Sequence, residues 1–197
     1  MEINAEKVKE LREKTGIGMM KCKEALLACE GNFDKAIEYL RKRGLATAEK
    51  KSVRTTNEGR ICGYIHTTNK VGVLVELNCE TDFVAKGEEF AQLGKDICMQ
   101  VAASKPVAIK PEDVPPEVIA KEKEIYAEQV KGKPANIVDK IVEGKLKAYF
   151  KEVCLLEQPF IKDPAVSIND LIKGKIAKFG ENITVRRFVR YQLGEEL

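Results

Sequence analysis

The chain has 197 residues, with 34 basic and 31 acidic side chains, a formal net charge of +3 and 44% hydrophobic residues. This apolar share is too high for an intrinsically disordered protein, and the charge is too small to indicate a nucleic-acid-binding surface by itself. A chain of this length forms one or two domains and can bury roughly 70% of the surface of its unfolded state.

The first 44 residues contain three segments in which apolar side chains recur at helical spacing. The apolar positions of the three segments are, in order, Val8 and Leu11, then Cys22, Leu26 and Cys29, then Phe33, Ile37 and Leu40. Asn4 and Asn32 are placed to cap the first and third helices, which we expect to stop at Gly16 and Gly44. The second helix is predicted from about Met19 to Cys29. Such helices can share one small core, near the lower size limit for independent folding.

Residues 46–58 have almost no apolar periodicity, and we interpret them as a linker whose start can be helical. The apolar spacing then changes from helical to alternating over residues 61–65 and 71–79, with a short turn between them. This pattern is typical of a β-hairpin. A polar loop, ETDFVAKG, follows the second strand, and a helix is predicted from about Gly87 to Ser104.

All seven prolines lie after residue 105. Two helices are predicted at about 115–131 and 134–150, and their short connection indicates an antiparallel helical hairpin. A further helix begins at the capping-box pattern of Ser167 and Asp170, and residues 183–191 are predicted to form a third strand. Two adjacent strands and one distant strand, interleaved with helices, predict an α+β fold in which helices cover a small antiparallel three-stranded sheet.

The sequence shows neither the pattern of a targeting segment nor the spacing of metal-binding or redox-active cysteines. The amino terminus has neither an apolar export segment nor an Arg- and Ser-rich leader, and the longest apolar stretch, 71–75, is far shorter than the roughly 20 residues of a spanning helix. We therefore expect a cytoplasmic protein with no membrane partner. No C-x-x-C pair supports a zinc or redox site. Reduced, mostly buried thiols are expected for Cys22, Cys29, Cys62, Cys79, Cys98 and Cys154.

The sequence contains no catalytic constellation. His66 is the one histidine, and on an extended strand it lies about 13 Å from Cys62, too far for a hydrogen bond. The segment Gly16-Ile17-Gly18 lacks the third glycine of a dinucleotide-binding loop and follows a helix rather than a strand. We expect no enzyme activity, no metal and no cofactor. Direct nucleic-acid binding is not expected either, because aromatic and basic residues are not interleaved.

Surface recognition remains as a source of function. Met19 and Met20 are adjacent at a helix start, about 100° apart around its axis, so a small core can hardly bury both. One core and one exposed methionine would fit this, and so would an adaptable protein-docking surface. Phe83 lies in the polar loop between a strand and a helix. It either packs under the following helix or forms an exposed aromatic anchor for a partner, with Asp82 as its polar neighbour.

Two long motifs carry a family resemblance. Residues 11–26, LREKTGIGMMKCKEAL, and residues 76–85, ELNCETDFVA, closely resemble the two signature stretches of the bacterial elongation factor Ts family. Segments at 102–114, 133–147 and 157–163 are also similar to the family, so the resemblance covers nearly the whole chain in order. The chain is similar to the short form of the family, which has a single core subdomain.

The resemblance implies a division into three regions. Residues 1–45 resemble a ubiquitin-associated-type (UBA-like) three-helix docking domain, residues 46–58 a linker, and residues 59–197 an α+β dimerisation and core domain. The helical hairpin at 115–150 corresponds in this comparison to the family's protruding coiled coil.

The resemblance also implies a partner and a mechanism. Members of this family are guanine-nucleotide exchange factors for elongation factor Tu: they bind its GDP-bound and nucleotide-free forms, dislodge Mg²⁺ and release GDP so that GTP rebinds during translation elongation. Docking of the N-terminal region is implied for Arg12, Met19 and Met20. Displacement of the partner's Mg²⁺ is implied for Thr81, Asp82, Phe83 and Val84.

A homodimer, giving a 2:2 complex, is expected because a three-stranded sheet with helices on one face leaves its other face or an edge uncovered. On the third strand one face is predicted to carry Ile183, Val185, Val189, Tyr191 and Leu193. The candidates for the shared interface are Phe188 and the face of the first strand that carries Cys62, Tyr64 and His66.

Two other functional classes stay open on the residues alone. The chain can be a protein-binding module whose three N-terminal helices capture ubiquitin-like folds or helices, with the remainder as scaffold. A nucleic-acid-binding protein fits the balanced charge less well. Release of labelled GDP from elongation factor Tu, measured with and without the protein, discriminates among the three.

Overall fold

The structure is a computed structural model that describes residues 4–131 and 134–195. Contacts divide the chain into two compact units, each built from segments that are distant in sequence. The first unit comprises Met1–Arg60, Leu77–Gly87 and Asp170–Thr184. The second comprises Ile61–Glu76, Glu88–Asn169 and Val185–Leu197.

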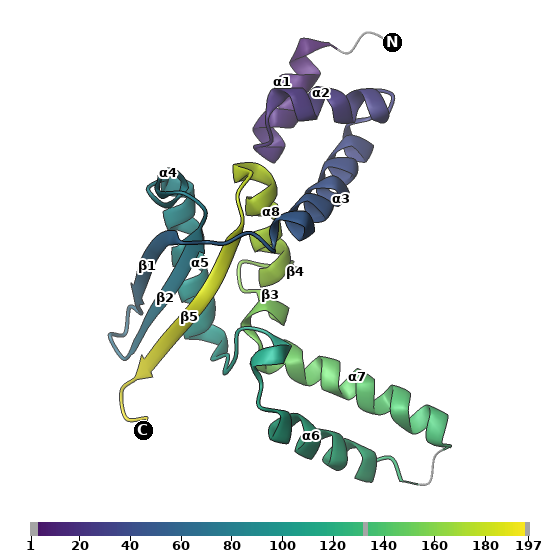
Figure 1. The fold of residues 1–197 in the computed structure, drawn as a ribbon, viewed down its shortest axis with the longest axis vertical. Helices are drawn as coiled ribbons and strands as arrows, with labels where there is room; N and C mark the ends of the chain where they lie inside the picture. Colours follow the sequence, from purple (N-terminus) through teal and green to yellow (C-terminus); the bar gives the residue numbers. More distant parts are fainter. Residues whose placement is uncertain (1–3, 132–133, 196–197) are drawn as a thin grey trace. The chain divides into compact units, whose positions relative to one another are not determined.

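The three N-terminal helices begin where the sequence predicts them. They are α1 (Ala5–Thr15), α2 (Met19–Ala28) and α3 (Phe33–Lys51) (Figure 1). Both predicted caps are present: the side chain of Asn4 accepts the N–H of Glu6, and that of Asn32 accepts the N–H of Lys35, each at 3.0 Å. The helices enclose a small core of Val8, Leu11, Cys22, Ala25, Leu26, Ala36 and Leu40.

The prediction that the third helix stops at Gly44 is wrong, because α3 continues to Lys51. Residues 45–51 are mostly good helix formers, so the helix continues past the roughly 1 kcal/mol that an internal glycine costs relative to alanine. The absence of a side chain at Gly44 serves packing: a Cβ there would lie 3.0 Å from the Cβ of Ala177 in another helix. The segment without helix or strand therefore begins at Ser52 rather than at residue 46.

The predicted three-stranded sheet is confirmed. It consists of β1 (Glu58–Ile65), β2 (Val71–Cys79) and β5 (Ile183–Gln192) in the order β1-β2-β5, and it is antiparallel. The helix α5 (Glu88–Ser104) lies against the strands (Figure 1), and the Cys98 thiol donates to the carbonyl of Cys62 at 3.4 Å. The fold class is therefore α+β, as expected.

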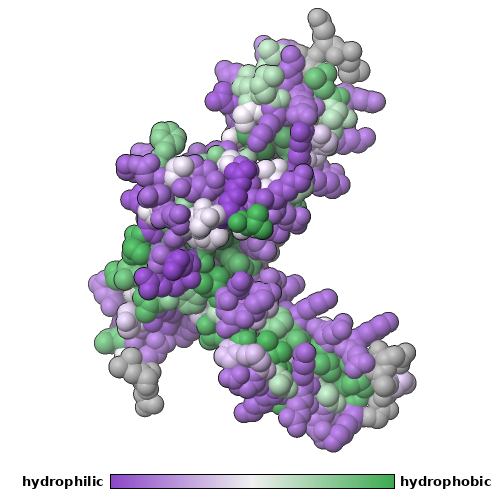
Figure 2. Space-filling model, in the orientation of Figure 1, coloured by the Kyte–Doolittle hydropathy of each residue, from purple (hydrophilic) through white to green (hydrophobic). Residues whose placement is uncertain are grey.

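The open face of the sheet is not the face that the sequence suggested. Cys62 is buried, and its thiol lies close enough to Cys98 of α5 to help raise the pKa of Cys98, so the face that carries Cys62 lies under a helix. Tyr64 and Phe188 are only half-exposed. Because successive side chains of a strand point to opposite faces, the neighbours of Cys62 point the other way. The exposed apolar side chains of the second unit's strands are Ile61, Ile65, Leu74, Val189 and Tyr191. Figure 2 shows hydrophobic side chains at the surface over these strands.

Two further helices, α6 (Pro116–Glu128) and α7 (Ala135–Val153), pack against each other and run in opposite directions (Figure 1). Lys145 of α7 hydrogen-bonds the side chain of Gln129 and lies over the ring of Tyr126. The connection predicted at Gly132-Lys133 lies outside the described residues.

The remaining elements are short. A single helical turn, α4 (Asp82–Ala85), follows β2, and 3-10 turns occupy Pro111–Asp113 and Leu155–Glu157. The sequence pattern did not predict the two-stranded sheet of β3 (Pro159–Phe160) and β4 (Asp163–Ser167), which precedes α8 (Ile168–Phe179). No helix among the described residues is both long enough and apolar enough to cross a membrane.

Candidate functional site

The loop after β2 presents the residues Thr81 to Val84. Thr81 has extended backbone angles and caps the turn α4, since its hydroxyl oxygen accepts the N–H of Val84 at 3.5 Å. Ala85, at the end of the turn, is buried. Asp82 is exposed and pairs with Lys86 at 2.7 Å, one turn further along. The hydrogen bond from Lys86, and then its charge, lower the pKa of the Asp82 carboxyl.

Phe83 is 84% exposed, while Val84 beside it is half-buried. The interpretation in which Phe83 packs under the following helix is therefore wrong, and the exposed-anchor interpretation describes its position. A large aromatic ring with so little of its surface buried adds almost nothing to the folded core. Exposed aromatic side chains on a rigid support are typical of protein–protein contacts.

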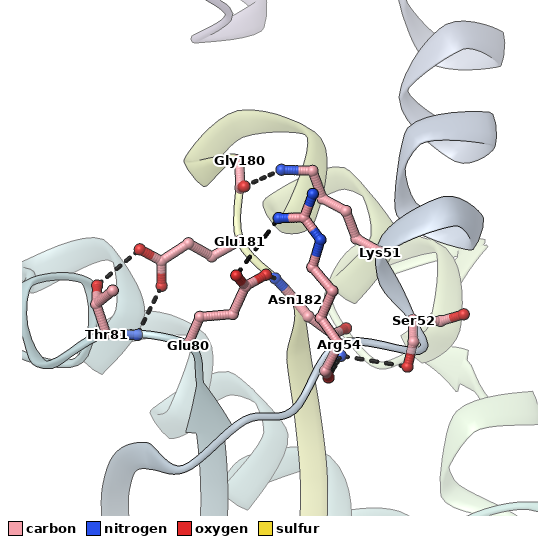
Figure 3. Close-up of polar contacts among 8 residues, drawn as sticks. All are labelled: Lys51, Ser52, Arg54, Glu80, Thr81, Gly180, Glu181 and Asn182. Atoms are coloured by element: carbon pink, nitrogen blue, oxygen red, sulfur yellow. Dashed lines mark hydrogen bonds and ion pairs between the residues drawn. The ribbon is translucent and has the colours of Figure 1, made fainter.

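A polar network surrounds the start of this loop (Figure 3). The carboxylate of Glu181 accepts the backbone N–H of Thr81 at 3.0 Å and its hydroxyl at 2.6 Å. The carboxylate of Glu80 accepts the backbone N–H of Asn182 at 2.6 Å. Sequence reasoning missed Glu80, Glu181 and Asn182, because their partners lie about 100 residues away in the chain and no local pattern signals them.

The predicted docking residues all lie on the surface of the three-helix region. Arg12 is exposed on α1, and Met19 and Met20 form the start of α2 with 40% and 79% of their surfaces exposed. The alternative in which one of the two methionines belongs to the core is therefore wrong, since neither side chain is buried. Exposed methionines are polarisable and flexible, and they suit an adaptable contact surface.

No metal cluster is found among residues 4–131 and 134–195, and most of the thiols there are buried. No group of three or more His, Cys, Asp or Glu side chains there is arranged to hold a metal ion. All six cysteines are free, and five are buried, as expected. Burial raises the pKa of Cys98 to about 12 and that of Cys154 to about 11. Thiols with such pKa values remain protonated and unreactive near neutral pH.

We expect one fast-reacting thiol per chain when the folded protein is treated with a disulfide reagent at pH 8. Cys29 is the half-buried cysteine, whereas Cys98 is buried and its pKa, raised to about 12, leaves almost none of it as the reactive thiolate at this pH. The absorbance of released thiolate measures this, and the other thiols should react only in denaturant. Cys29→Ser should abolish the fast phase; two or more fast thiols in wild type would contradict the burial described above.

Comparisons with known proteins place these features in one family. The profile described as Elongation factor TS matches residues 38–195. Elongation factor Ts of Thermodesulfovibrio yellowstonii is 63% identical over 196 residues, covering 99% of this chain and 98% of the relative. Elongation factor Ts of Fervidobacterium nodosum is 57% identical and covers 99% and 100%. The chain belongs to the elongation factor Ts family.

The elongation factor Ts relatives match 99% of this chain, so the match extends into the helices before residue 38 that the profile leaves out. The two motifs that carry the resemblance now have a place in the fold. Residues 11–26 span the end of α1 and most of α2, and residues 76–85 span the end of β2 and all of α4. The first motif thus contains the exposed side chains of Met19 and Met20, and the second contains that of Phe83.

Proposed function

We propose that the protein is a cytoplasmic guanine-nucleotide exchange factor for elongation factor Tu and has no catalytic chemistry of its own. Membership of the elongation factor Ts family supports the role and the partner. The observation that carries the mechanism is the exposed ring of Phe83 on a turn that is capped and hydrogen-bonded at its base. Such a ring can enter a partner's pocket without losing contacts in its own fold.

Exchange requires only a difference in affinity. A protein that binds nucleotide-free elongation factor Tu more tightly than the GDP-bound form weakens GDP binding by the same factor, because the two binding equilibria are linked. The factor therefore need not contact the nucleotide. In this proposal the Phe83 ring wedges into elongation factor Tu near its Mg²⁺ site, the ion leaves and GDP follows.

The surrounding residues of the loop have supporting roles in the proposal. Thr81 caps the turn that carries the ring, and Asp82 offers an exposed carboxylate that pairs with Lys86. Val84 adds apolar contact beside Phe83. GTP, which is more abundant in the cell than GDP, then rebinds.

A second contact would supply affinity. We assign this to a UBA-like docking domain, residues 1–45, through Arg12, Met19 and Met20, whose side chains reach the surface. In this proposal residues 52–57, between the end of α3 and the start of β1, connect the docking helices to the core domain, 59–197, and the pair α6 and α7 forms its protruding coiled coil. A docking element that is separate from the wedge raises the local concentration of the wedge at its target.

The direct test is release of fluorescent GDP from purified elongation factor Tu after an excess of unlabelled nucleotide is added. Catalytic amounts of the protein should accelerate release by orders of magnitude, with excess Mg²⁺ opposing the effect. Binding to elongation factor Tu without faster GDP release would instead support a protein-binding module. Binding to RNA and not to elongation factor Tu would support a nucleic-acid-binding protein.

We also propose that the protein works as a homodimer. The exposed apolar side chains of β1, β2 and β5 in the second unit are Ile61, Ile65, Leu74, Val189 and Tyr191, on the sheet face opposite Cys62. Several exposed apolar side chains gathered on one face of a sheet often mark a surface that another protein covers. A two-fold axis through the face would let one copy cover the other and give a 2:2 complex with elongation factor Tu.

Sedimentation equilibrium at micromolar concentration should therefore give twice the chain mass of 22.0 kDa. Leu74→Lys should give the mass of a single chain, because it places a charge in the middle strand of the apolar face at a half-exposed position that tolerates it in the monomer. Val107→Lys, at an exposed position outside the sheet, is the control and should remain dimeric. A wild-type mass near that of one chain, unchanged on concentrating, would contradict the dimer.

A further inference from the structure

The turn that carries Phe83 cannot order itself. α4 has only four residues, and so short a helix is unstable in water without outside support. The exposed ring of Phe83 adds no burial, and the hydroxyl of Thr81 reaches the N–H of Val84 only at 3.5 Å. The order of the loop must therefore come from contacts to other segments of the first unit.

Two crossed pairs of residues supply the side-chain hydrogen bonds among these contacts (Figure 3). Glu181 accepts both donors of Thr81, the backbone N–H at 3.0 Å and the hydroxyl at 2.6 Å. In return, Glu80 accepts the backbone N–H of Asn182 at 2.6 Å. Each glutamate thus binds the residue that follows the other glutamate. We call these three hydrogen bonds the brace.

The brace acts on the cap directly. Because the hydroxyl proton of Thr81 points to Glu181, a lone pair of the same oxygen remains free to accept the N–H of Val84. Hydrogen bonds to a charged carboxylate are also shorter and roughly twice as strong as those between neutral groups. The charge of Glu181 therefore holds Thr81 in the conformation that caps α4.

The brace is itself anchored to the segment that follows α3. Asn182 is 1% exposed, and its side-chain amide donates to the carbonyls of Ser52 and Arg54 at 3.3 and 2.8 Å. Arg54 also pairs with Glu80 at 3.4 Å, and Lys51 donates to the carbonyl of Gly180. The base of the Phe83 loop is thus held by the same residues that end the three-helix region.

We propose that Glu181 is a positioning residue for exchange, which through the brace keeps the Thr81–Val84 loop ordered so that Phe83 meets its partner in the binding conformation. This inference rests on the proposed exchange of nucleotide on elongation factor Tu. Glu181 acts through Thr81 and contacts neither the partner nor the nucleotide. An ordered loop does not lose conformational entropy when the ring inserts, so the inserted state forms more often.

The test separates docking from insertion. In the GDP-release assay the rate is measured against the concentration of the protein, which gives a maximal rate and a half-saturating concentration. Glu181→Ala should lower the maximal rate about tenfold, the scale expected for loss of a hydrogen bond to a charged group, and leave the half-saturating concentration within about twofold. Glu181→Gln retains an acceptor oxygen and should be intermediate. Glu195→Ala, which removes a different exposed carboxylate paired with Arg190, should match wild type.

A double substitution tests whether Glu181 acts through the ring. In the Phe83→Ala background, Glu181→Ala should have no further effect on the maximal rate, because the group it positions is gone. Additive losses would overturn the proposal. A lower melting temperature together with a higher half-saturating concentration for Glu181→Ala would assign Glu181 to general folding, and that result would overturn it too.

A readout on the free protein keeps this inference distinct from the exchange function. Hydrogen exchange at the amide of Thr81 should accelerate about tenfold or more in Glu181→Ala, because this amide loses its acceptor. If wild type does not speed GDP release, the proposed function fails, and amide exchange alone decides whether the brace orders the loop. Unchanged exchange at Thr81 would contradict the brace whatever the activity of the wild type.

Discussion

Phe83→Ala is expected to slow GDP release from elongation factor Tu by about tenfold to several hundredfold, which corresponds to roughly 1.4–3.5 kcal/mol of lost transition-state stabilisation. The reason is that the ring is 84% exposed in the free protein, so its apolar surface is available to the partner alone. Fluorescent GDP release at saturating protein measures the effect. The melting temperature should hardly change, since removal of a ring outside the core leaves no cavity.

Val107→Ala is the matched control, because Val107 is another strongly exposed apolar side chain, in the loop after α5. It should exchange nucleotide at the wild-type rate. Phe83→Leu retains part of the apolar volume and should recover part of the lost rate. A Phe83→Ala protein that melts many degrees lower, or one that exchanges at the wild-type rate, would contradict the anchor role.

The elements with strong local signals could be predicted from the sequence. Asn4 and Asn32 are the N-cap residues of α1 and α3, at the positions where helical periodicity starts. The change to alternating apolar residues located the hairpin of β1 and β2. The end of α3 could not be predicted, because Gly44 is read locally as a stop while its actual role is to admit Ala177 from α8. The strands β3 and β4 are too short for any periodic pattern to appear.

The candidate site also has features that the sequence could predict and features that depend on the folded structure. The motif around Phe83 could be recognised from its residues, but its exposure depended on whether the following helix covered it, which is a tertiary property. Similarly, alternation showed that the first strand has two faces but did not show that α5 covers the one with Cys62. Glu181 and Asn182 carry no local signal, since hydrogen bonds between residues about 100 positions apart arise only when the chain has folded.

Met20→Asp is expected to raise the half-saturating concentration for exchange at least about tenfold and to leave the maximal rate unchanged. Met20 is 79% exposed at the start of α2, so an aspartate is solvated in the free protein and the fold is not disturbed. In a complex the same carboxylate would lose its water against an apolar contact, which costs several kcal/mol when no partner compensates. Titration of the GDP-release rate with the variant measures the shift.

A point substitution tests docking more cleanly than deletion of residues 1–44. Such a deletion would cut α3 before Lys51 and remove Gly44 from its contact with Ala177, so lost activity would also reflect damage to the first unit.

Val107→Asp introduces the same charge at an exposed apolar position of the other unit and should behave as wild type. If Met20→Asp left the half-saturating concentration unchanged, α2 would lie outside the interface, and Phe83 would have to supply both docking and exchange. With a shift in half-saturation for Met20→Asp and a fall in maximal rate for Phe83→Ala, the two exposed apolar sites would have separate roles in one mechanism.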